Sequence, residues 1–199
     1  MKLIAISIES FAKNESDALC ALFNTGLELF HLRKPVATEE EMRNFLQQLP
    51  AQFYNRIVLH DHFLLLEEFN LKGVHLNTRN TTPPQTSMHI SKSCHSLEEL
   101  QTISEFDYVF VSPIFDSISK QGYARAFSHK ELVKAKNEGR INENVMALGG
   151  ISSETVEIAR NYGFGGVAVL GALWGDFENT SDIGSLLQRF ATFKKLCTD

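Results

Sequence analysis

Two apolar runs that end on glycine, both in the C-terminal third of the chain, have the spacing of a phosphate-binding site. The run at residues 144–152 contains Gly149 and Gly150 and leads into a helical segment, and the run at residues 165–172 contains Gly171. Backbone N–H groups approach an oxyanion closely where no Cβ intervenes, and a following helix N-terminus adds partial positive charge. Glycine pairs are also common in tight turns, so this pair alone is evenly balanced between the two interpretations.

A second group of polar residues ends the strand-like run at residues 27–33. Side chains alternate along a strand, so His31 and Arg33 share one face while Phe30 and Leu32 share the other. The planar guanidinium of arginine suits a phosphate or a carboxylate. A surface ion pair is the ordinary alternative for Arg33.

The run at residues 56–61 ends in Asp61, which lies between His60 and His62. Adjacent residues on a strand point in opposite directions, so these three side chains cannot all face one metal ion. Asp61 is therefore a general base, a ligand for a hard cation, or the N-cap of the helix predicted to begin at Phe63.

His95 is the best-placed of the seven histidines for acid/base work. It follows the strand predicted over residues 88–94 and shares a face with Ser93, whereas Cys94 points away and packs. A histidine side chain at a strand tip can both accept and donate a proton in catalysis. His75 lies in the middle of its strand, where a histidine is more often a satisfied interior group than a catalyst.

A polar loop follows the strand-like run at residues 108–113. It contains Ser117, Ser119 and Lys120, and such a loop can close over an oxyanion. Lysine-bearing loops are also commonly just solvated.

Strand-like and helical patterns alternate along the chain. The eight strand-like runs are residues 2–8, 27–33, 56–61, 73–77, 88–94, 108–113, 145–151 and 166–170. This order is typical of a parallel sheet, and eight units favour a compact (β/α)8 barrel with short loops over an open doubly wound sheet. We therefore expect one barrel domain over residues 1–199, with its catalytic groups at the C-terminal strand tips.

Helix starts are marked by three capping-box patterns, in which a serine or threonine precedes a glutamate by three residues. They are Thr38 with Glu41, Ser96 with Glu99, and Ser128 with Glu131. A closing helix is expected over residues 183–196, and the polar, proline-containing stretch at residues 78–87 indicates a loop.

Composition excludes several classes of protein. The net charge is −5 and no block of lysine or arginine occurs, so nucleic acid is not an expected partner. No apolar run approaches the ~20 residues of a membrane helix, and the N-terminus lacks a signal-peptide pattern. Three scattered cysteines without a CxxC pair argue against a disulfide framework or a zinc site and fit the cytoplasm.

Taken together, these residues resemble the thiamine phosphate synthase/TenI family, and the likeness extends from the second strand to the eighth. The motifs that carry it are His31-Leu32-Arg33, His60-Asp61, Gly73-Val74-His75-Leu76, Ser93-Cys94-His95-Ser96, the stretch from Asp107 through Pro113-Ile114-Phe115 to Lys120, Ala147-Leu148-Gly149-Gly150-Ile151, and Gly166-Val167-Ala168-Val169. Their order and spacing are specific as a set, although no single motif is.

The resemblance implies a (β/α)8 barrel enzyme of thiamine biosynthesis. Enzymes of the synthase branch join a pyrimidine diphosphate to a thiazole phosphate with Mg²⁺ and release pyrophosphate. Enzymes of the TenI branch shift a double bond in a thiazole phosphate carboxylate, which makes the ring aromatic, and they use no metal. A homodimer is also what the family suggests.

The resemblance also assigns roles by position. It places the thiazole phosphate at the glycine turns, the synthase pyrophosphate and closing loop at the polar tips, and one of two magnesium aspartates at Asp61. The binding residues implied are His31, Arg33, Asp61, Ser93, Ser117, Ser119, Lys120, Gly149, Gly150, Leu170 and Gly171. His95 falls in the Ser-x-His-Ser context where TenI-type tautomerases place their acid/base histidine.

Several positions depart from the synthase pattern. Synthases typically show Gln-x-Arg-Glu-Lys at the second strand tip, where this chain has His31 for the glutamine and Pro35 for the lysine. The Asn-Asp pair after the third strand is His60-Asp61, and the second magnesium aspartate falls at Asn80. Mg²⁺ prefers charged oxygen ligands, so an amide at Asn80 weakens such a site.

We therefore expect a metal-independent thiazole tautomerase, with His95 moving the proton and Arg33 or Lys120 opposing the substrate carboxylate. The first alternative is a thiamine phosphate synthase with an altered Mg²⁺ site at Asp61. The second is a non-catalytic protein that binds thiazole phosphate.

Overall fold

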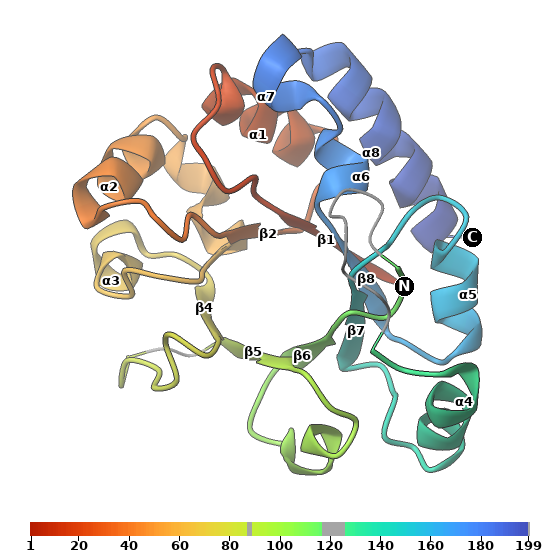
Figure 1. Cartoon of the computed structure of the whole chain (residues 1–199). Coiled ribbons are helices and arrows are strands. Elements are labelled where there is room, and N and C mark those ends of the chain that lie inside the picture. The colour runs from red at the N-terminus through yellow and green to blue at the C-terminus, as the bar shows by residue number, and fades with distance from the viewer. Residues whose placement is uncertain (87–88, 117–125, 199) are drawn as a thin grey trace.

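Eight parallel strands close into a barrel in the computed structural model of this chain, and the helices surround it (Figure 1). The structure describes residues 1–86, 89–116 and 126–198. The strands are β1 (Lys2–Ile6), β2 (Leu29–Leu32), β3 (Ile57–Leu59), β4 (Gly73–Leu76), β5 (Ile90–Cys94), β6 (Tyr108–Val111), β7 (Val145–Leu148) and β8 (Gly166–Val169). Because β8 pairs with both β7 and β1, the sheet has no open edge, and the predicted barrel is confirmed.

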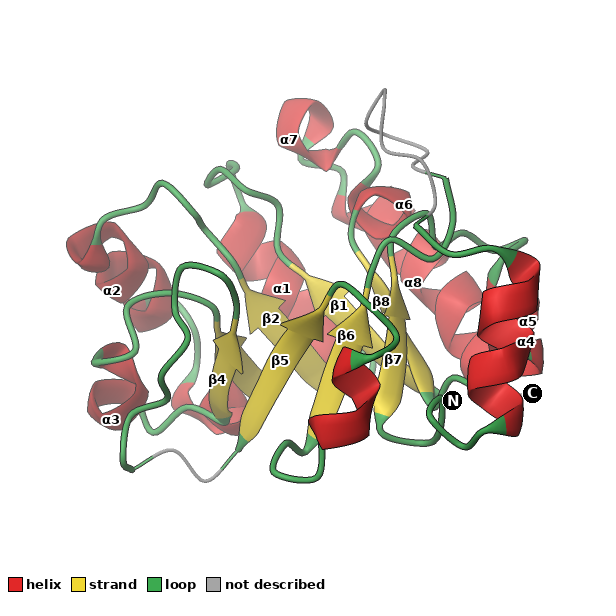
Figure 2. Cartoon of the chain, turned by 60° about the horizontal axis from the view of Figure 1, so that its bottom comes forward, coloured by secondary structure: helices red, strands yellow, loops and turns green. Residues whose placement is uncertain are grey.

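Helices connect the strands on the outside, as the side view shows (Figure 2). They are α1 (Glu15–Asn24), α2 (Glu39–Gln47), α3 (Leu65–Phe69), α4 (His129–Asn137), α5 (Val156–Asn161), α6 (Gly171–Trp174), α7 (Phe177–Thr180) and α8 (Ile183–Thr198). A short 3-10 turn, η1 (Ala51–Arg56), also precedes β3. The predicted helices are therefore largely present, whereas the two short helices α6 and α7 after β8 were not anticipated.

The capping boxes explain where two helices begin. Thr38 and Glu41 cap α2 reciprocally, and Ser128 and Glu131 do the same for α4, as predicted. After β5, however, only a 3-10 turn, η2 (Glu99–Thr102), forms in place of the predicted helix. Glu99 still accepts hydrogen bonds from the N–H groups just before this turn, so the capping signal is present without a full helix.

Asp61 is not a helix cap, contrary to one of the three sequence interpretations. Helix α3 begins two residues later than expected, its N-cap is Leu64, and no side chain caps it. The intervening residue His62 adopts a left-handed backbone conformation with φ of 55°. This turn separates Asp61 from the helix and leaves the carboxylate at the strand tip.

The main hydrophobic core lies between the strands and the helices. Helix α2 shows the pattern: Met42, Phe45 and Leu46 are buried at i, i+3 and i+4, while its acidic residues face outward. Outward strand residues such as Phe30 and Leu32 pack into the same layer. This layer fixes the strand positions and thereby the direction of every inward side chain.

A smaller apolar cluster fills part of the barrel interior. Its members are Ile4, Ile6, Tyr108, Phe110, Met146 and Ala168, which come from β1, β6, β7 and β8. The inward positions of β2, β4 and β5 carry polar side chains instead. The interior is therefore divided into an apolar half and a polar half.

No helix in the described part of the chain is long and apolar enough to cross a membrane. Cys20, Cys94 and Cys197 are free thiols. Cys94 is buried in the outer core, as the strand alternation predicted.

Candidate active site

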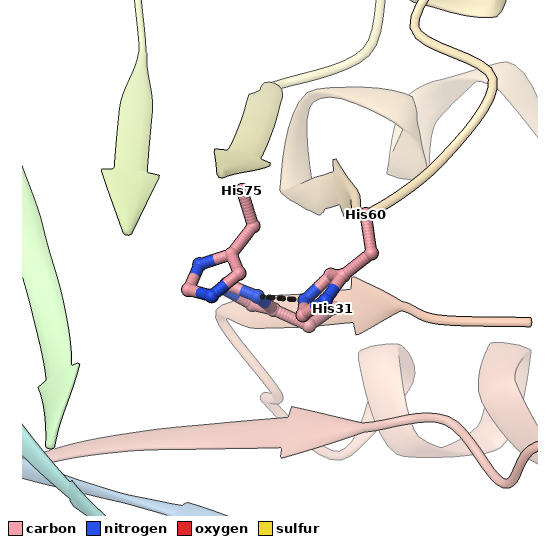
Figure 3. Close-up of side chains that lie close together, drawn as sticks. All are labelled: His31, His60 and His75. Atoms are coloured by element: carbon pink, nitrogen blue, oxygen red, sulfur yellow. Dashed lines mark hydrogen bonds between the residues drawn. The ribbon is translucent and has the colours of Figure 1, made fainter. Parts of the chain in front are cut away.

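Three histidine side chains converge in the polar half of the barrel interior (Figure 3). His31 lies on β2, His75 lies on β4, and His60 directly follows β3. Nδ1 of His31 is 2.8 Å from Nε2 of His60, and the rings of His60 and His75 stack with centroids 4.3 Å apart. His31 and His75 are fully buried and His60 is 5% exposed, so these rings are closely packed polar groups.

Hydroxyl groups bind the other buried ring nitrogens. Nδ1 of His75 is 2.8 Å from Oγ of Ser91, and Nε2 of His75 is 2.8 Å from Oγ of Ser93. Nε2 of His31 is hydrogen-bonded to the Tyr108 hydroxyl. Buried polar groups are costly unless they are paired, and these pairings leave His75 and His31 with both nitrogens satisfied.

Burial keeps these histidines uncharged. It lowers the pKa of His75 to about 3, and it lowers the pKa of His31 and of His60 well below the usual range, with a smaller contribution from neighbouring charges. Burial also raises the pKa of the Tyr108 hydroxyl. Near neutral pH the group therefore consists of neutral imidazoles and a neutral phenol, each able both to donate and to accept a hydrogen bond.

The three histidines also lie close enough together to be considered as a metal site, with ligand atoms within 4.8 Å of one another. Neutral imidazole is a good ligand for transition metals. However, His31 and His60 bond directly to each other at 2.8 Å, and His75 is held by two serines. A metal ion would have to break these bonds, so the geometry fits a hydrogen-bonded array better than a metal centre.

At the tip of β3, Asp61 is held by side chains from the loop after β4. Both oxygens of Asp61 lie 3.1 Å from the guanidinium Nη2 of Arg79, and Oδ1 accepts a hydrogen bond of 2.8 Å from the Asn80 amide. The same amide donates to the backbone carbonyl of His60 at 2.9 Å. A positive guanidinium and an amide donor therefore occupy the coordinating face of this carboxylate.

Arg33 lies at the tip of β2, directly after its last residue, Leu32. Its guanidinium forms an ion pair of 2.8 Å with Glu9, and the Arg33 side chain is 29% exposed. The Ser7 hydroxyl at the tip of β1 bonds to both the N–H and the C=O of Arg33 at 2.8 Å. The backbone of Arg33 is thus fixed, while its guanidinium remains accessible to an anionic ligand.

The neighbouring Lys34 is part of the framework. It is fully buried, forms an ion pair of 2.6 Å with Glu15 at the start of α1, and donates to the Ser10 carbonyl. Burial lowers the pKa of Lys34 and raises that of Glu15, while their mutual attraction opposes both shifts. The pair anchors the β2 tip to α1.

The glycine turns after β7 and β8 contain Gly149, Gly150 and Gly171, which are all partly exposed. Gly149 and Gly150 have φ of 91° and 65°, values that side-chain-bearing residues rarely adopt. A Cβ on Gly150 would lie 2.4 Å from the carbonyl oxygen of Asp116, so the segment after β6 packs directly on this turn. No described residue accepts a hydrogen bond from the N–H of Gly150 or of Gly171. Both the turn interpretation and the phosphate interpretation are compatible with this geometry.

The remaining predicted residues are distributed as follows. His95 is exposed at the tip of β5, and its backbone N–H donates to Glu99. Ser93 points into the barrel toward His75, while His31 is too deeply buried to contact a ligand at the mouth directly. Leu170 immediately precedes α6. Ser117, Ser119 and Lys120 lie outside the described residues.

Comparison with known proteins shows the family to which this chain belongs. The family model described as thiamine monophosphate synthase matches residues 3–173 of the chain. The chain belongs to this thiamine monophosphate synthase family. A thiamine-phosphate synthase of Actinobacillus succinogenes is 28% identical to it over 196 residues, which cover 90% of this chain and 86% of that protein.

Solved structures agree with this assignment. A crystal structure of thiamine phosphate pyrophosphorylase from Bacteroides thetaiotaomicron has a TM-score of 0.89 and 39% identity, covering 100% of this chain and 98% of that one. A thiamine phosphate pyrophosphorylase from Pyrococcus furiosus has a TM-score of 0.72 at 21% identity, over 98% of this chain and 96% of that one, which shows a shared fold. The chain is therefore a member of an enzyme family of thiamine biosynthesis.

The synthase branch of the family implies Mg²⁺, so the fit of the metal position can be tested here. Mg²⁺ requires near-octahedral oxygen ligation and favours carboxylates. In this chain the Asp61 carboxylate forms an ion pair with Arg79, and the Asn80 side-chain amide donates a hydrogen bond to the same carboxylate. These residues do not fit a Mg²⁺ site formed by Asp61 and position 80.

The histidine array is not predictable from the separate motifs of the sequence. His60 and His75 were each considered separately, and Tyr108 and Ser91 were not considered as site residues. Their inward alternation on β4, β5 and β6 was readable, because Ser91, Ser93 and His75 occupy positions that a barrel turns to its centre. Their mutual contacts depend on strand register, which the sequence does not specify.

Proposed function

We propose that this chain catalyses the metal-independent tautomerisation of a thiazole phosphate carboxylate to its aromatic form. The observation that carries the proposal is the engagement of Asp61 by Arg79 and Asn80. A synthase needs that carboxylate for Mg²⁺, whereas a tautomerase needs only proton transfer. The guanidinium therefore replaces the cation of a synthase with a permanent positive charge.

The glycine turns supply the phosphate-binding part of the proposal. The N–H groups of Gly150 and Gly171 have no acceptor among the described residues, and both follow strands at the C-terminal end of the barrel. Such donors suit a phosphate dianion. Leu170 contributes the backbone that connects β8 to Gly171.

The substrate carboxylate is assigned to Arg33. Its partly exposed guanidinium can form a bidentate pair with a carboxylate, in competition with Glu9. Lys120 is the second cation of the sequence hypothesis, and it lies outside the described residues.

His95 is proposed as the acid/base residue at the tip of β5. The His95 side chain is exposed, and it lies two residues after Ser93 along the chain. Removing a general acid/base costs about 10²-fold or more, so His95→Gln should lower turnover by that factor. Unchanged turnover would remove His95 from the proposal.

A thiamine phosphate synthase is the second candidate, favoured by the names of the relatives. The curated relatives of Actinobacillus succinogenes and Listeria welshimeri are both called thiamine-phosphate synthase. In that case the chain would couple a pyrimidine diphosphate to a thiazole phosphate and release pyrophosphate. A synthase would have to tolerate Pro35 and Asn80 at the altered positions.

Two parallel assays decide between these candidates. One supplies hydroxymethylpyrimidine diphosphate, thiazole phosphate and Mg²⁺ and measures thiamine phosphate. The other supplies the non-aromatic thiazole phosphate carboxylate with a chelator and measures ultraviolet absorbance of the aromatic product. We expect turnover only in the second assay. Thiamine phosphate formation would establish the synthase, and binding without turnover in either assay would establish a thiazole phosphate binder.

A further inference from the structure

We propose that His60 donates a hydrogen bond from its ring Nδ1–H to the carboxylate of the substrate, beside Arg33. His31 and Tyr108, which lie deeper in the barrel, act as positioning residues that keep the proton on this nitrogen. The use of the bond in catalysis rests on the proposed tautomerase function, in which the substrate carries a carboxylate. The protonation of His60 and its contact with a carboxylate can be measured without turnover.

One nitrogen of the histidine array is left open. Five of the six ring nitrogens form hydrogen bonds to other side chains, namely both nitrogens of His31, both nitrogens of His75, and Nε2 of His60. No described residue bonds to Nδ1 of His60, and this atom is not among the fully buried, unpartnered polar atoms of the described chain. Nδ1 of His60 therefore reaches solvent, although the residue as a whole is only 5% exposed.

Backbone contacts hold His60 at the C-terminal rim of the barrel, next to Arg33. The His60 N–H donates to the Leu32 carbonyl at 3.2 Å, so Arg33, the next residue along, lies beside His60. The His60 carbonyl accepts hydrogen bonds from the side-chain amides of Asn77 at 3.1 Å and Asn80 at 2.9 Å. The ring turns into the barrel, where the two fully buried histidine rings fill the space beside it (Figure 3). The open nitrogen therefore faces the mouth of the barrel.

Two hydrogen bonds that begin at Tyr108 determine which nitrogen of His60 carries the proton. A phenol is a stronger acid than a neutral imidazole, and an imidazole nitrogen is a stronger base than a phenol oxygen, so Tyr108 donates to Nε2 of His31. His31 then carries its own proton on Nδ1 and donates it to Nε2 of His60, which is 2.8 Å away. Because Nε2 of His60 is an acceptor, the proton of His60 is on Nδ1.

This donor is uncharged. Burial lowers the pKa of His60 well below its usual range, and the neighbouring histidines and guanidiniums act in the same direction. A neutral imidazole whose other nitrogen is occupied offers one directed N–H, and that N–H is a weak acid. His60 is therefore a hydrogen-bond donor to the substrate, while proton transfer remains with His95.

Such a donor stabilises the charge that develops when the substrate loses its proton. In the proposed reaction His95 takes a proton from a ring carbon, and the electron pair of the broken C–H bond spreads over the ring and its carboxylate. The carboxylate oxygens gain negative charge, so a fixed N–H binds them more strongly in the transition state than in the ground state. His95 then returns the proton to another carbon, and no proton or electron is gained or lost.

The first test measures the tautomer of His60 by ¹⁵N NMR of the intact protein, labelled on its histidine rings. We expect a protonated Nδ1 and an unprotonated Nε2 on both His60 and His31. The variants His60→Gln and His31→Gln identify the signals. A proton on Nε2 of His60 in the wild-type protein would overturn the proposal, because Nδ1 would then present a lone pair to the carboxylate.

The second test removes the hydroxyl from which the two hydrogen bonds begin. Tyr108→Phe keeps the ring but leaves His31 without its donor, so we expect His60 to populate both tautomers. Tyr54→Phe is the matched control, because the Tyr54 hydroxyl donates to the Leu46 carbonyl outside the barrel, and His60 should keep one tautomer there. An unchanged His60 tautomer in Tyr108→Phe would refute the positioning role of Tyr108.

The third test uses two ligands that do not react. One is the aromatic thiazole phosphate carboxylate, which is the product of the proposed reaction, and the other is thiazole phosphate without the carboxylate. We expect the Nδ1–H signal of His60 to move only when the first ligand is added. No movement with the first ligand, or the same movement with both, would overturn the proposed contact.

Kinetics test whether the contact contributes to catalysis. His60→Leu removes the donor, whereas His60→Gln retains a side-chain N–H. We expect His60→Leu to lower kcat about 10²-fold with a smaller change in KM, and His60→Gln to recover part of the loss. His129→Leu is the control, because the His129 ring bonds to the Tyr162 hydroxyl at 2.7 Å on the exposed surface, and kcat should stay normal. Normal kcat in His60→Leu would exclude His60 from catalysis.

These readouts separate failure of the His60 contact from failure of the proposed function. If the carboxylate ligand moves the His60 signal but the protein does not aromatise the thiazole, then the tautomerase is wrong and the contact is retained. If aromatisation proceeds but the His60 signal does not respond to the carboxylate, then the contact is wrong and the tautomerase is retained.

Discussion

The two halves of the barrel interior are both buried, but different interactions hold their side chains in place. In the apolar half, residues such as Ile6 and Met146 need no partners beyond van der Waals contact. In the polar half, both ring nitrogens of His31 and of His75 form hydrogen bonds, so the position and the orientation of each ring are fixed together. The apolar half therefore contributes stability through packing, whereas the polar half places specific atoms at specific points.

Phe110 at the boundary gives the largest expected effect. Its ring centroid lies 4.7 Å from that of His31 and 4.7 Å from that of His75, and the side chain is fully buried. Phe110→Ala should cost about 3–5 kcal/mol in the free energy of unfolding, measured by urea denaturation. Phe11→Ala is the control, because Phe11 is 38% exposed and its loss should cost much less. Equal costs would contradict a closely packed boundary.

The next largest effect on the free energy of unfolding is expected when the pH is lowered, because His31, His60 and His75 lie in the polar half of the interior. The unfolded chain protonates its histidines near pH 6.5, whereas His75 resists protonation in the fold until about pH 3. Between these values the unfolded state binds more protons, so stability falls as pH falls. His75 alone should remove about 3 kcal/mol between about pH 7 and about pH 4, measured as urea midpoints. His75→Gln should flatten this dependence, and an unchanged slope would place the cause elsewhere.

A substitution at Gly150, in the glycine turn after β7, should have an intermediate effect on stability. Gly150→Ala introduces a Cβ 2.4 Å from Asp116 O at a φ of 65°, so it should cost about 1–3 kcal/mol and weaken binding of thiazole phosphate. Gly139→Ala is the matched control, since its φ is 71° and nothing lies within 4 Å of the added Cβ. Binding measured by calorimetry should change only for Gly150→Ala. Equal effects of the two variants on binding would dissociate the turn from the phosphate.

The smallest effect is expected at the Arg33–Glu9 pair. Both side chains are partly exposed, so Glu9→Gln should change stability by less than about 1 kcal/mol. Removing this competing carboxylate should tighten binding of a carboxylate-bearing thiazole by up to a few-fold. Glu157→Gln, which breaks the exposed pair with Arg160 on α5, controls for loss of a surface charge. Weaker binding in Glu9→Gln would remove Arg33 from the substrate site.

The barrel could be predicted because its signals are local. Strand and helix patterns, two of the capping boxes and the inward face of His31 depend on spacing along the chain. The same reasoning put Cys94 in the outer core. Each of these follows from the alternation of side chains or from residues three positions apart.

The polar array and the state of Asp61 could not be predicted in the same way. The bond between His31 and His60 joins residues 29 positions apart, and the bond between His31 and Tyr108 joins residues 77 apart. Whether Asp61 faces a metal or Arg79 depends on how the loop after β4 folds back over the β3 tip. Such contacts are decided by strand register and loop path, which single-sequence patterns do not contain.

The two partners of Asp61 should respond differently to salt. The Arg79 side chain is 46% exposed and is held to Asp61 by charge, which added salt screens, whereas the Asn80 amide joins Asp61 to the His60 carbonyl through short hydrogen bonds. The loop after β4 should therefore stay attached to the β3 tip at high ionic strength, even where the guanidinium is released.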